Sequence, residues 1–240
     1  MIQPYCNLNK NSRKARDFQL RERAVLATAL KSFGSDHWES VTVAQIARDV
    51  GIAKGTMYLH FASKQEIYAR LALDFYQALT EHLAQTQARS ATDKLRELIT
   101  RAFEFHLEQP DYRRVTQYCE REDFRRNIKP QLAKAFNEID NRLQAIISSV
   151  LLQGIAEGSF KKRPPQQIIL GLQCTFHGAL NRFWCNRNGE QDHPHSFIDL
   201  VASYMLESTL DDHQPGHSTD PAPSIKNPRL TAGKPMELTT

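Results

Sequence analysis

The segment from residue 42 to residue 64 constrains the fold of this chain more than any other part of it. It reads TVAQIARDVGIAKGTMYLHFASK. Thr42 is a favourable N-cap, and Gly51 can adopt the left-handed conformation that commonly ends a helix. Between them Ala44, Ile46, Ala47 and Val50 supply the apolar positions of a helix. The pattern predicts a short helix over residues 43–50 that ends in a tight turn.

A second short helix is predicted to begin near Ala53. Its first turn contains a basic, a small and a hydroxyl-bearing residue, namely Lys54, Gly55 and Thr56. Residues of these types suit a helix that lies in a major groove, against phosphates and base edges. Two short helices joined by a tight turn form a helix-turn-helix, for which duplex DNA is the default partner.

The flanks of this motif decide between a DNA-binding unit and two packed helices of some other all-α protein. A helical stretch from Phe18 to Phe33 carries apolar residues at three- and four-residue spacing and supplies the third helix that the unit needs for a core. Phe61 is the expected apolar plug. Ser63 with Glu66 three residues later forms a capping box for the next helix.

On these residues the chain resembles the TetR family of bacterial transcription regulators. The stretch from Arg21 to Ile67 is similar to that family's DNA-binding domain, and GIAKGTMYLHFASK resembles its most specific signature. Two departures are visible: Ala53 stands where the family often has Ser, and Ala62 where it often has Pro, Gly or a charged residue. Ala53 removes a hydroxyl that could have touched a phosphate.

The charge distribution agrees with a DNA-binding N-terminal part. Residues 1–70 hold 11 Lys or Arg against 6 Asp or Glu, whereas the remaining residues hold 20 against 21. The basic footprint therefore lies on the helix-turn-helix half. No apolar run approaches the length of a membrane span, and the N-terminus has no signal pattern, so we expect a soluble cytoplasmic protein.

The rest of the pattern is helical up to about residue 210, without any period-two alternation. We expect helices over 63–87, 92–108, 113–124, 130–157, 164–185 and 196–210. The predicted fold is all-α, with a three-helix helix-turn-helix domain at 17–62 and a helical ligand-binding and dimerisation domain at 63–210. Residues 1–16 are either a solvated leader or a flexible basic arm that adds DNA contacts. Residues 211–240 form a polar tail that we expect to be disordered.

Residues 168–185 carry apolar side chains on nearly every side of a helix, so two faces need cover. An ordinary central helix of a monomer would satisfy this pattern. A helix-turn-helix unit, however, normally binds paired half-sites and needs a two-fold partner. The family resemblance implies a four-helix dimer contact made by the last two helices. The expected interface residues are Ile169, Leu172, Phe176, Leu180, Phe183, Phe197, Val201 and Tyr204.

The leading hypothesis is a homodimeric repressor that a small molecule releases from a palindromic operator, with recognition helices about 34 to 36 Å apart. The alternative is a DNA-bound interaction protein controlled by a protein partner. The expected phosphate contacts are Thr42, Lys54, Tyr58, His60 and Lys64, and the expected base contacts are Gly55 and Thr56, with Lys54 sharing both roles.

The resemblance implies an effector pocket in the C-terminal half and a movement of the helix at 63–87 when it fills. Aromatic residues with a few polar atoms predict an apolar or aromatic ligand. The expected lining is Phe103, His106, Tyr118, Phe136, Phe176, His177 and Trp184. The alternative is that these rings pack in the core and line no ligand pocket. We expect no cofactor, no metal and no enzymatic activity, because no catalytic constellation stands out in the sequence.

Overall fold

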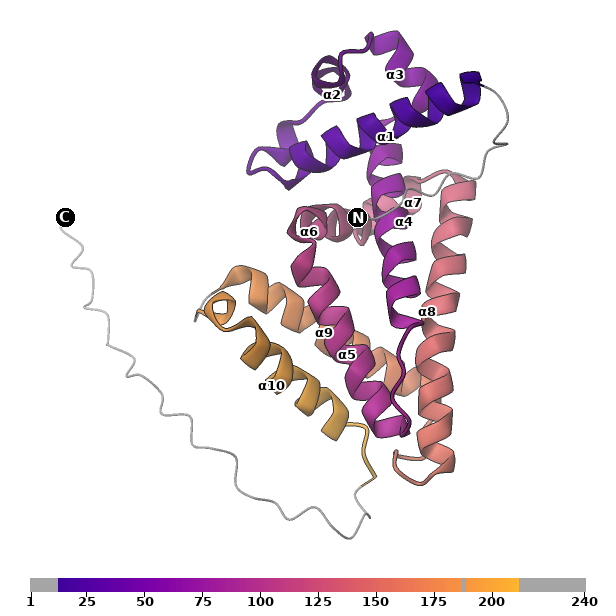
Figure 1. Cartoon of the computed structure of the whole chain (residues 1–240), viewed down its shortest axis with the longest axis vertical. Coiled ribbons are helices and arrows are strands. Elements are labelled where there is room, and N and C mark those ends of the chain that lie inside the picture. The colour runs from indigo at the N-terminus through magenta and orange to yellow at the C-terminus, as the bar shows by residue number, and fades with distance from the viewer. Residues whose placement is uncertain (1–12, 187–188, 212–240) are drawn as a thin grey trace, which may run out of the picture.

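The computed structural model describes residues 13–186 and 189–211, and in these ranges it contains helices but no β-strand (Figure 1). This confirms the predicted all-α class. The α-helices are α1 (Arg13–Gly34), α2 (Val43–Val50), α3 (Lys54–His60), α4 (Lys64–Leu83), α5 (Ala91–Glu108), α6 (Arg113–Cys119), α7 (Glu122–Asn127), α8 (Pro130–Ala156), α9 (Pro165–Cys185) and α10 (Pro194–Glu207). Three 3-10 helices are η1 (Trp38–Ser40), η2 (Pro110–Tyr112) and η3 (Glu190–Asp192).

The helix-turn-helix forms as predicted from local sequence. The Thr42 side chain accepts the backbone N–H of Gln45, and the Gln45 side chain accepts the N–H of Thr42, which closes a capping box on α2. Gly51 follows with φ 77°, a left-handed conformation that favours glycine. In Figure 1, α1 runs across the molecule beneath α2 and α3. The core between these helices is fully buried at Ala29, Phe33, Ile46, Met57 and Phe61.

The start of α4 differs from the predicted capping box in one detail. The Ser63 side chain accepts the N–H of Glu66, as expected. The Glu66 carboxylate, however, accepts the N–H of Ala62 rather than that of Ser63. The same carboxylate lies 2.8 Å from Nζ of Lys129, at the start of α8. Glu66 therefore ties the beginnings of α4 and α8 together.

The C-terminal half is a bundle in which α4 and α8 run side by side (Figure 1). The helix α5 packs against α8 and α10, and α9 packs against α8. The predicted helix at 113–124 is two helices, because Arg121 is extended, with ψ 142°, and interrupts the helical backbone. The linking helix α4 ends at Leu83, before the predicted residue 87, where Thr86 donates a hydrogen bond to the Leu83 carbonyl.

The two termini were predicted to lie outside the folded part. Helix α1 already begins at Arg13, so residues 13–16 of the predicted arm are helical. The rest of that arm, and the predicted tail beyond residue 211, lie outside the described residues. Asp211 itself is held against the α8–α9 connection, where its N–H donates to the Ser159 carbonyl. Within the described residues, no helix has the length and hydropathy to span a membrane.

Candidate nucleic-acid interface and cavity

The outer face of α3 is the candidate nucleic-acid interface. Lys54, Gly55 and Tyr58 are exposed on it, and Thr56 is half-buried. Met57 faces the opposite way and is fully buried in the three-helix core. The helix thus presents a basic, a small and a phenolic residue outward while one apolar side chain anchors it. This is the arrangement that a recognition helix requires.

Leu59 is a candidate contact residue that sequence reasoning missed. Its side chain is 76% exposed, although it is a large apolar residue on a helix with a buried face. Leu59 stands four residues after Gly55, so helical spacing places the two on the same face. An exposed apolar side chain in a major groove can contact the methyl group of thymine.

Thr42 stands at the start of α2, and its side chain is exposed. Its hydroxyl already has two local partners, since it accepts the Gln45 N–H at 3.2 Å and donates to Oε1 of Gln45 at 2.9 Å. Any phosphate contact of Thr42 therefore adds to a capping role.

His60 lies on the inner side of α3. It is only 8% exposed, and its ring centroid lies 4.0 Å from that of Phe18 on α1. Burial lowers the pKa of His60, so the neutral imidazole is favoured. The ring thus packs α3 on α1, and the phosphate contact predicted for His60 stays a prediction.

Lys64 also has a structural role. Its Nζ donates to the backbone carbonyl of Glu39 at 3.1 Å and to that of Trp38 at 3.4 Å. The ammonium group lies 5.6 Å from the ring centroid of Phe33 and 5.9 Å from that of Tyr68. Burial lowers the pKa of Lys64. The side chain therefore joins the start of α4 to η1, and its predicted phosphate contact is likewise a prediction only.

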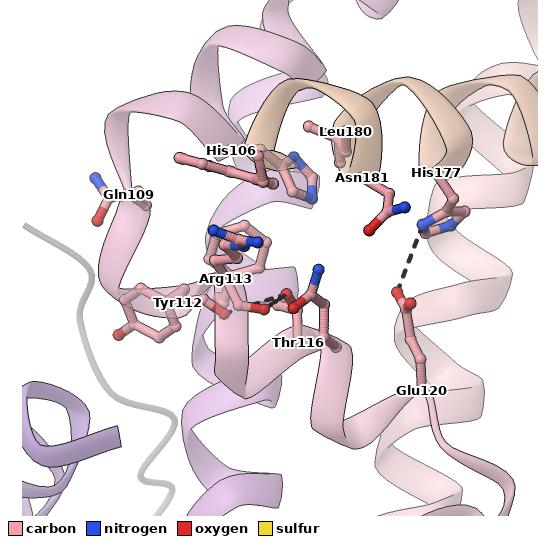
Figure 2. Close-up of a pocket in the computed structure, with 12 residues that line it drawn as sticks. His106, Gln109, Tyr112, Arg113, Thr116, Glu120, His177, Leu180 and Asn181 are labelled. Atoms are coloured by element: carbon pink, nitrogen blue, oxygen red, sulfur yellow. Dashed lines mark hydrogen bonds and ion pairs between the residues drawn. The ribbon is translucent and has the colours of Figure 1, made fainter. Parts of the chain in front are cut away.

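A pocket of about 270 Å³ lies in the C-terminal half between α6 and α9 (Figure 2). Eight of the twelve residues that line it are Arg, Asn, Gln, Glu, His or Thr. The residues are Phe75, His106, Gln109, Tyr112, Arg113, Thr116, Gln117, Glu120, His177, Leu180, Asn181 and Trp184. Among the residues that the structure describes, no group of three or more His, Cys, Asp or Glu could hold a metal ion.

Three of the seven residues predicted to line a pocket do so, namely His106, His177 and Trp184. The other four lie elsewhere. Phe103 and Phe176 pack on each other with ring centroids 4.3 Å apart, and Phe136 is buried against Phe124. Tyr118 contacts Tyr68 on α4, and its ring centroid lies 6.3 Å from that of Trp38 in η1. The contacts of these four rings agree with the alternative given above, that they pack in the core.

Two pocket residues have unusual electrostatics. His106 donates from Nδ1 to the Ala102 carbonyl at 2.7 Å, and burial lowers its pKa to about 4. The ring is therefore neutral near pH 7, with a lone pair on Nε2. The guanidinium of Arg113 lies over the Trp184 ring, 5.3 Å from its centroid. Its Nε is buried and has no hydrogen-bond partner, and burial lowers the pKa of Arg113.

Glu120 lies at the other end of the pocket (Figure 2). Its carboxylate accepts a hydrogen bond from the Tyr76 hydroxyl at 3.2 Å and lies 3.6 Å from Nδ1 of His177. This group connects three helices, since Tyr76 belongs to α4 and His177 to α9, while Glu120 follows directly on α6. A change at this end of the pocket therefore acts on α4 directly.

The residues predicted for a subunit interface mostly face the chain's own core. Ile169, Leu172, Leu180 and Phe183 are each less than 9% exposed within one subunit. Phe176, Phe197 and Val201 are half-buried, and only Tyr204 is exposed, at 65%. The reason is that the stripe of larger side chains on α9 packs inward. The large apolar residues that α9 and α10 leave exposed are Leu170, Leu200 and Tyr204.

Comparison with known proteins agrees with the helix-turn-helix geometry. Residues 25–71 match the family described as "Bacterial regulatory proteins, tetR family". This N-terminal segment is a TetR-family DNA-binding domain. The ten α-helices of the described residues share the fold of a solved structure of a tetR family transcription regulator from Shewanella sp. PV-4, with TM-score 0.62 at 19% identity, over 80% of this chain and 98% of that one.

Several relatives are similar over larger parts of this regulator. The fatty acid metabolism regulator protein of Bacillus subtilis is 26% identical over 61% of this chain and 76% of its own length. The nucleoid occlusion factor SlmA of Actinobacillus pleuropneumoniae is 29% identical over 48% of this chain and 56% of its own length. The crystal structure of FadR from Bacillus subtilis with stearoyl-CoA shares the fold with TM-score 0.60, at 21% identity, over 77% of this chain and 95% of that one.

The different positions of Lys54 and Lys64 give a first prediction. Lys54→Ala should reduce the slope of log binding constant against log salt concentration by about one for each DNA-binding domain, because one phosphate contact is lost. Lys64→Ala should leave that slope unchanged and lower the free energy of unfolding by about 1 to 2 kcal/mol, since two hydrogen bonds from its ammonium group to the backbone carbonyls of Trp38 and Glu39 are lost. Duplex titrations at several salt concentrations and urea unfolding measure the two effects.

Arg126→Ala is the matched control, because Arg126 is an exposed cation on α7, outside the helix-turn-helix unit. It should change neither the salt slope nor the unfolding midpoint. A Lys64→Ala protein with wild-type stability and a reduced salt slope would assign Lys64 to phosphate instead.

Proposed function

We propose that this regulator is a homodimeric repressor that acts on a palindromic operator in the cytoplasm and that a small effector in the α6–α9 pocket releases it from DNA. The observation that carries the proposal is the position of α6. One side of this seven-residue helix lines the pocket, and the other side contacts the DNA-binding unit. The fold similarity to a regulator crystallised with stearoyl-CoA supports control by a small molecule.

The DNA contacts are proposed for the outer face of α3 and the start of α2. Lys54 and Tyr58 meet phosphates, together with Thr42. Gly55 and Thr56 lie against base edges, because a small and a hydroxyl-bearing residue allow close approach of the helix to the groove. Recognition helices of two subunits would then lie in successive major grooves.

The dimer is proposed to form through the last two helices, over the apolar side chains that one subunit leaves exposed. Leu170 on α9 is 62% exposed, and Leu200 and Tyr204 on α10 are 63% and 65% exposed. A two-fold contact would bury all three on both subunits. A charged substitution that tests the dimer must be made at one of these exposed residues. Phe183 is buried in its own subunit, so a charge there would unfold the chain.

Leu200→Asp and Tyr204→Asp should each give a folded monomer, since two like charges would meet across the two-fold axis. Leu152→Asp is the matched control, because Leu152 is 55% exposed and belongs to α8, not to either of the last two helices. Sedimentation measures the oligomeric state, and circular dichroism measures the helix content. If both α10 variants remain dimers, the interface lies on another surface.

Arg114 is the residue through which α6 acts on the DNA-binding unit. Its Nη1 donates to the Gly34 carbonyl at the end of α1, at 3.0 Å, and its Nη2 lies 2.9 Å from Oδ1 of Asp36. Arg113, the neighbouring residue, lines the pocket. A ligand that moves α6 therefore moves the end of α1, and through Tyr76 and Glu120 it also moves α4.

The repressor proposal is tested by finding the operator through selection from random duplex DNA, followed by a screen of organic acids, aromatic compounds and acyl-CoA esters for operator release. Effectors of such switches typically weaken binding 5- to 150-fold. Failure of every small molecule to release the operator would favour the alternative, control by a protein partner.

Arg114→Ala should uncouple the two sites. We expect the fold by which the effector weakens operator binding to fall at least about threefold. The effector itself should still bind with its wild-type dissociation constant, because Arg114 does not line the pocket. Arg142→Ala is the control, since Arg142 also links two helices by an exposed hydrogen bond, to Gln77 on α4. If the effector weakens operator binding of Arg114→Ala as much as that of the wild type, the two sites are coupled through α4 alone.

A further inference from the structure

We infer that the effector is a small planar carboxylate, an aromatic or heteroaromatic acid, rather than a long acyl chain. The inference rests on the proposed effector role of the α6–α9 pocket and adds the chemical class of its ligand. It narrows the apolar or aromatic ligand predicted from the sequence to one that carries a carboxylate. The chemistry of Arg113, His106 and the aromatic walls carries it.

Arg113 supplies a positive charge that lacks a counter-ion. No carboxylate lies within ion-pair distance of its guanidinium among residues 13–186 and 189–211, and its Nε is buried without any hydrogen-bond partner. Arg113 is half-buried, and withdrawing part of a cation from water without a paired anion costs free energy. A ligand carboxylate would remove this cost and match the planar fork of the guanidinium with two hydrogen bonds.

The negative group in the pocket is already engaged and does not neutralise Arg113. Glu120 accepts from the Tyr76 hydroxyl and lies beside Nδ1 of His177. Arg113 and Glu120 are seven residues apart, which is about 10 Å along a helix. The Arg113 end of the pocket is therefore the end that favours an anion.

His106 defines a second polar feature of the ligand. Its Nδ1 is committed to the Ala102 carbonyl, so Nε2 is an acceptor, and the low pKa of about 4 keeps the ring neutral. Figure 2 shows the side chains of His106, Arg113 and Asn181 around one common space. A hydroxyl or N–H group on the ligand ring would be the donor that Nε2 accepts.

Shape and size favour a flat, small molecule. Trp184, Tyr112 and Phe75 contribute aromatic surfaces to the lining. The pocket volume of about 270 Å³ is just below the range of about 300 to 1,000 Å³ that drug-sized ligands occupy. Most of the remaining lining is polar, which is unfavourable for a long hydrocarbon chain.

The test compares acids with their neutral amides on the full-length protein. The probes are benzoate, 2-hydroxybenzoate, 4-hydroxybenzoate and indole-3-carboxylate, each paired with the corresponding amide, together with stearoyl-CoA. Binding is followed by Trp184 fluorescence in a Trp38→Phe background and by calorimetry. We expect at least one acid to bind and to exceed its amide in affinity about 10- to 100-fold, the advantage of a charge-assisted hydrogen bond.

Arg113→Gln should remove this preference. The acid should lose about 10- to 100-fold in affinity, and the amide should bind as it does to the wild type. Arg113→Lys should retain part of the acid affinity, because it keeps the charge but not the fork. Arg126→Gln, an exposed arginine on α7, is the control and should leave both affinities unchanged. Thermal unfolding of the ligand-free Arg113 variants should show folds at least as stable as the wild type.

The outcomes separate this inference from the proposed function. If stearoyl-CoA releases the operator and no acid in the panel binds, the ligand class is wrong and the repressor proposal stands. Equal binding of acid and amide, or an unchanged preference in Arg113→Gln, also overturns the ligand class. If an acid binds through Arg113 but never weakens operator binding, the ligand class stands and the proposed effector role is wrong.

Discussion

An aromatic stack around Tyr68 joins the DNA-binding unit to the C-terminal half. Phe33 at the end of α1 stacks on Tyr68 with ring centroids 3.9 Å apart, and Tyr118 from α6 lies 4.3 Å from Tyr68 on centroid distance. Tyr68 is fully buried, and burial raises its pKa strongly. The ammonium group of Lys64 lies above Tyr68 and Phe33. Because α1, α4 and α6 share this contact, the DNA-binding unit cannot reorient without a change in α6 or α4.

This contact gives α6 two roles. Tyr118 and Arg114 contact the DNA-binding unit and the start of α4. Arg113 and Thr116, on another face of the same helix, line the pocket. Close packing transmits small displacements, since interiors have few voids to absorb them. A ligand shifts the equilibrium only as far as it favours one position of α6 over the other. The unpaired charge of Arg113 supplies such a preference, because a bound anion changes the electrostatics on the pocket side of this helix.

The sequence predicted the helix-turn-helix well because its determinants are local. Thr42, Gly51 and the apolar spacing of α2 act within a few residues of one another. The pocket was predicted less well. His106, His177 and Trp184 were named, but Arg113 was not, because an arginine gives no periodic signal and its burial depends on α9, more than fifty residues later in the chain.

The sequence by itself determined the all-α class and the helix-turn-helix, since caps, turns and helical periodicity are properties of short segments. Only the tertiary structure decided which of two possible roles a side chain has. Lys64 and His60 read as surface groups, yet both are held against neighbouring helices. Phe183 and Leu180 read as interface residues, yet they are buried in their own subunit. Periodicity shows that a helix face is apolar, but what covers that face depends on helices brought together from distant parts of the chain.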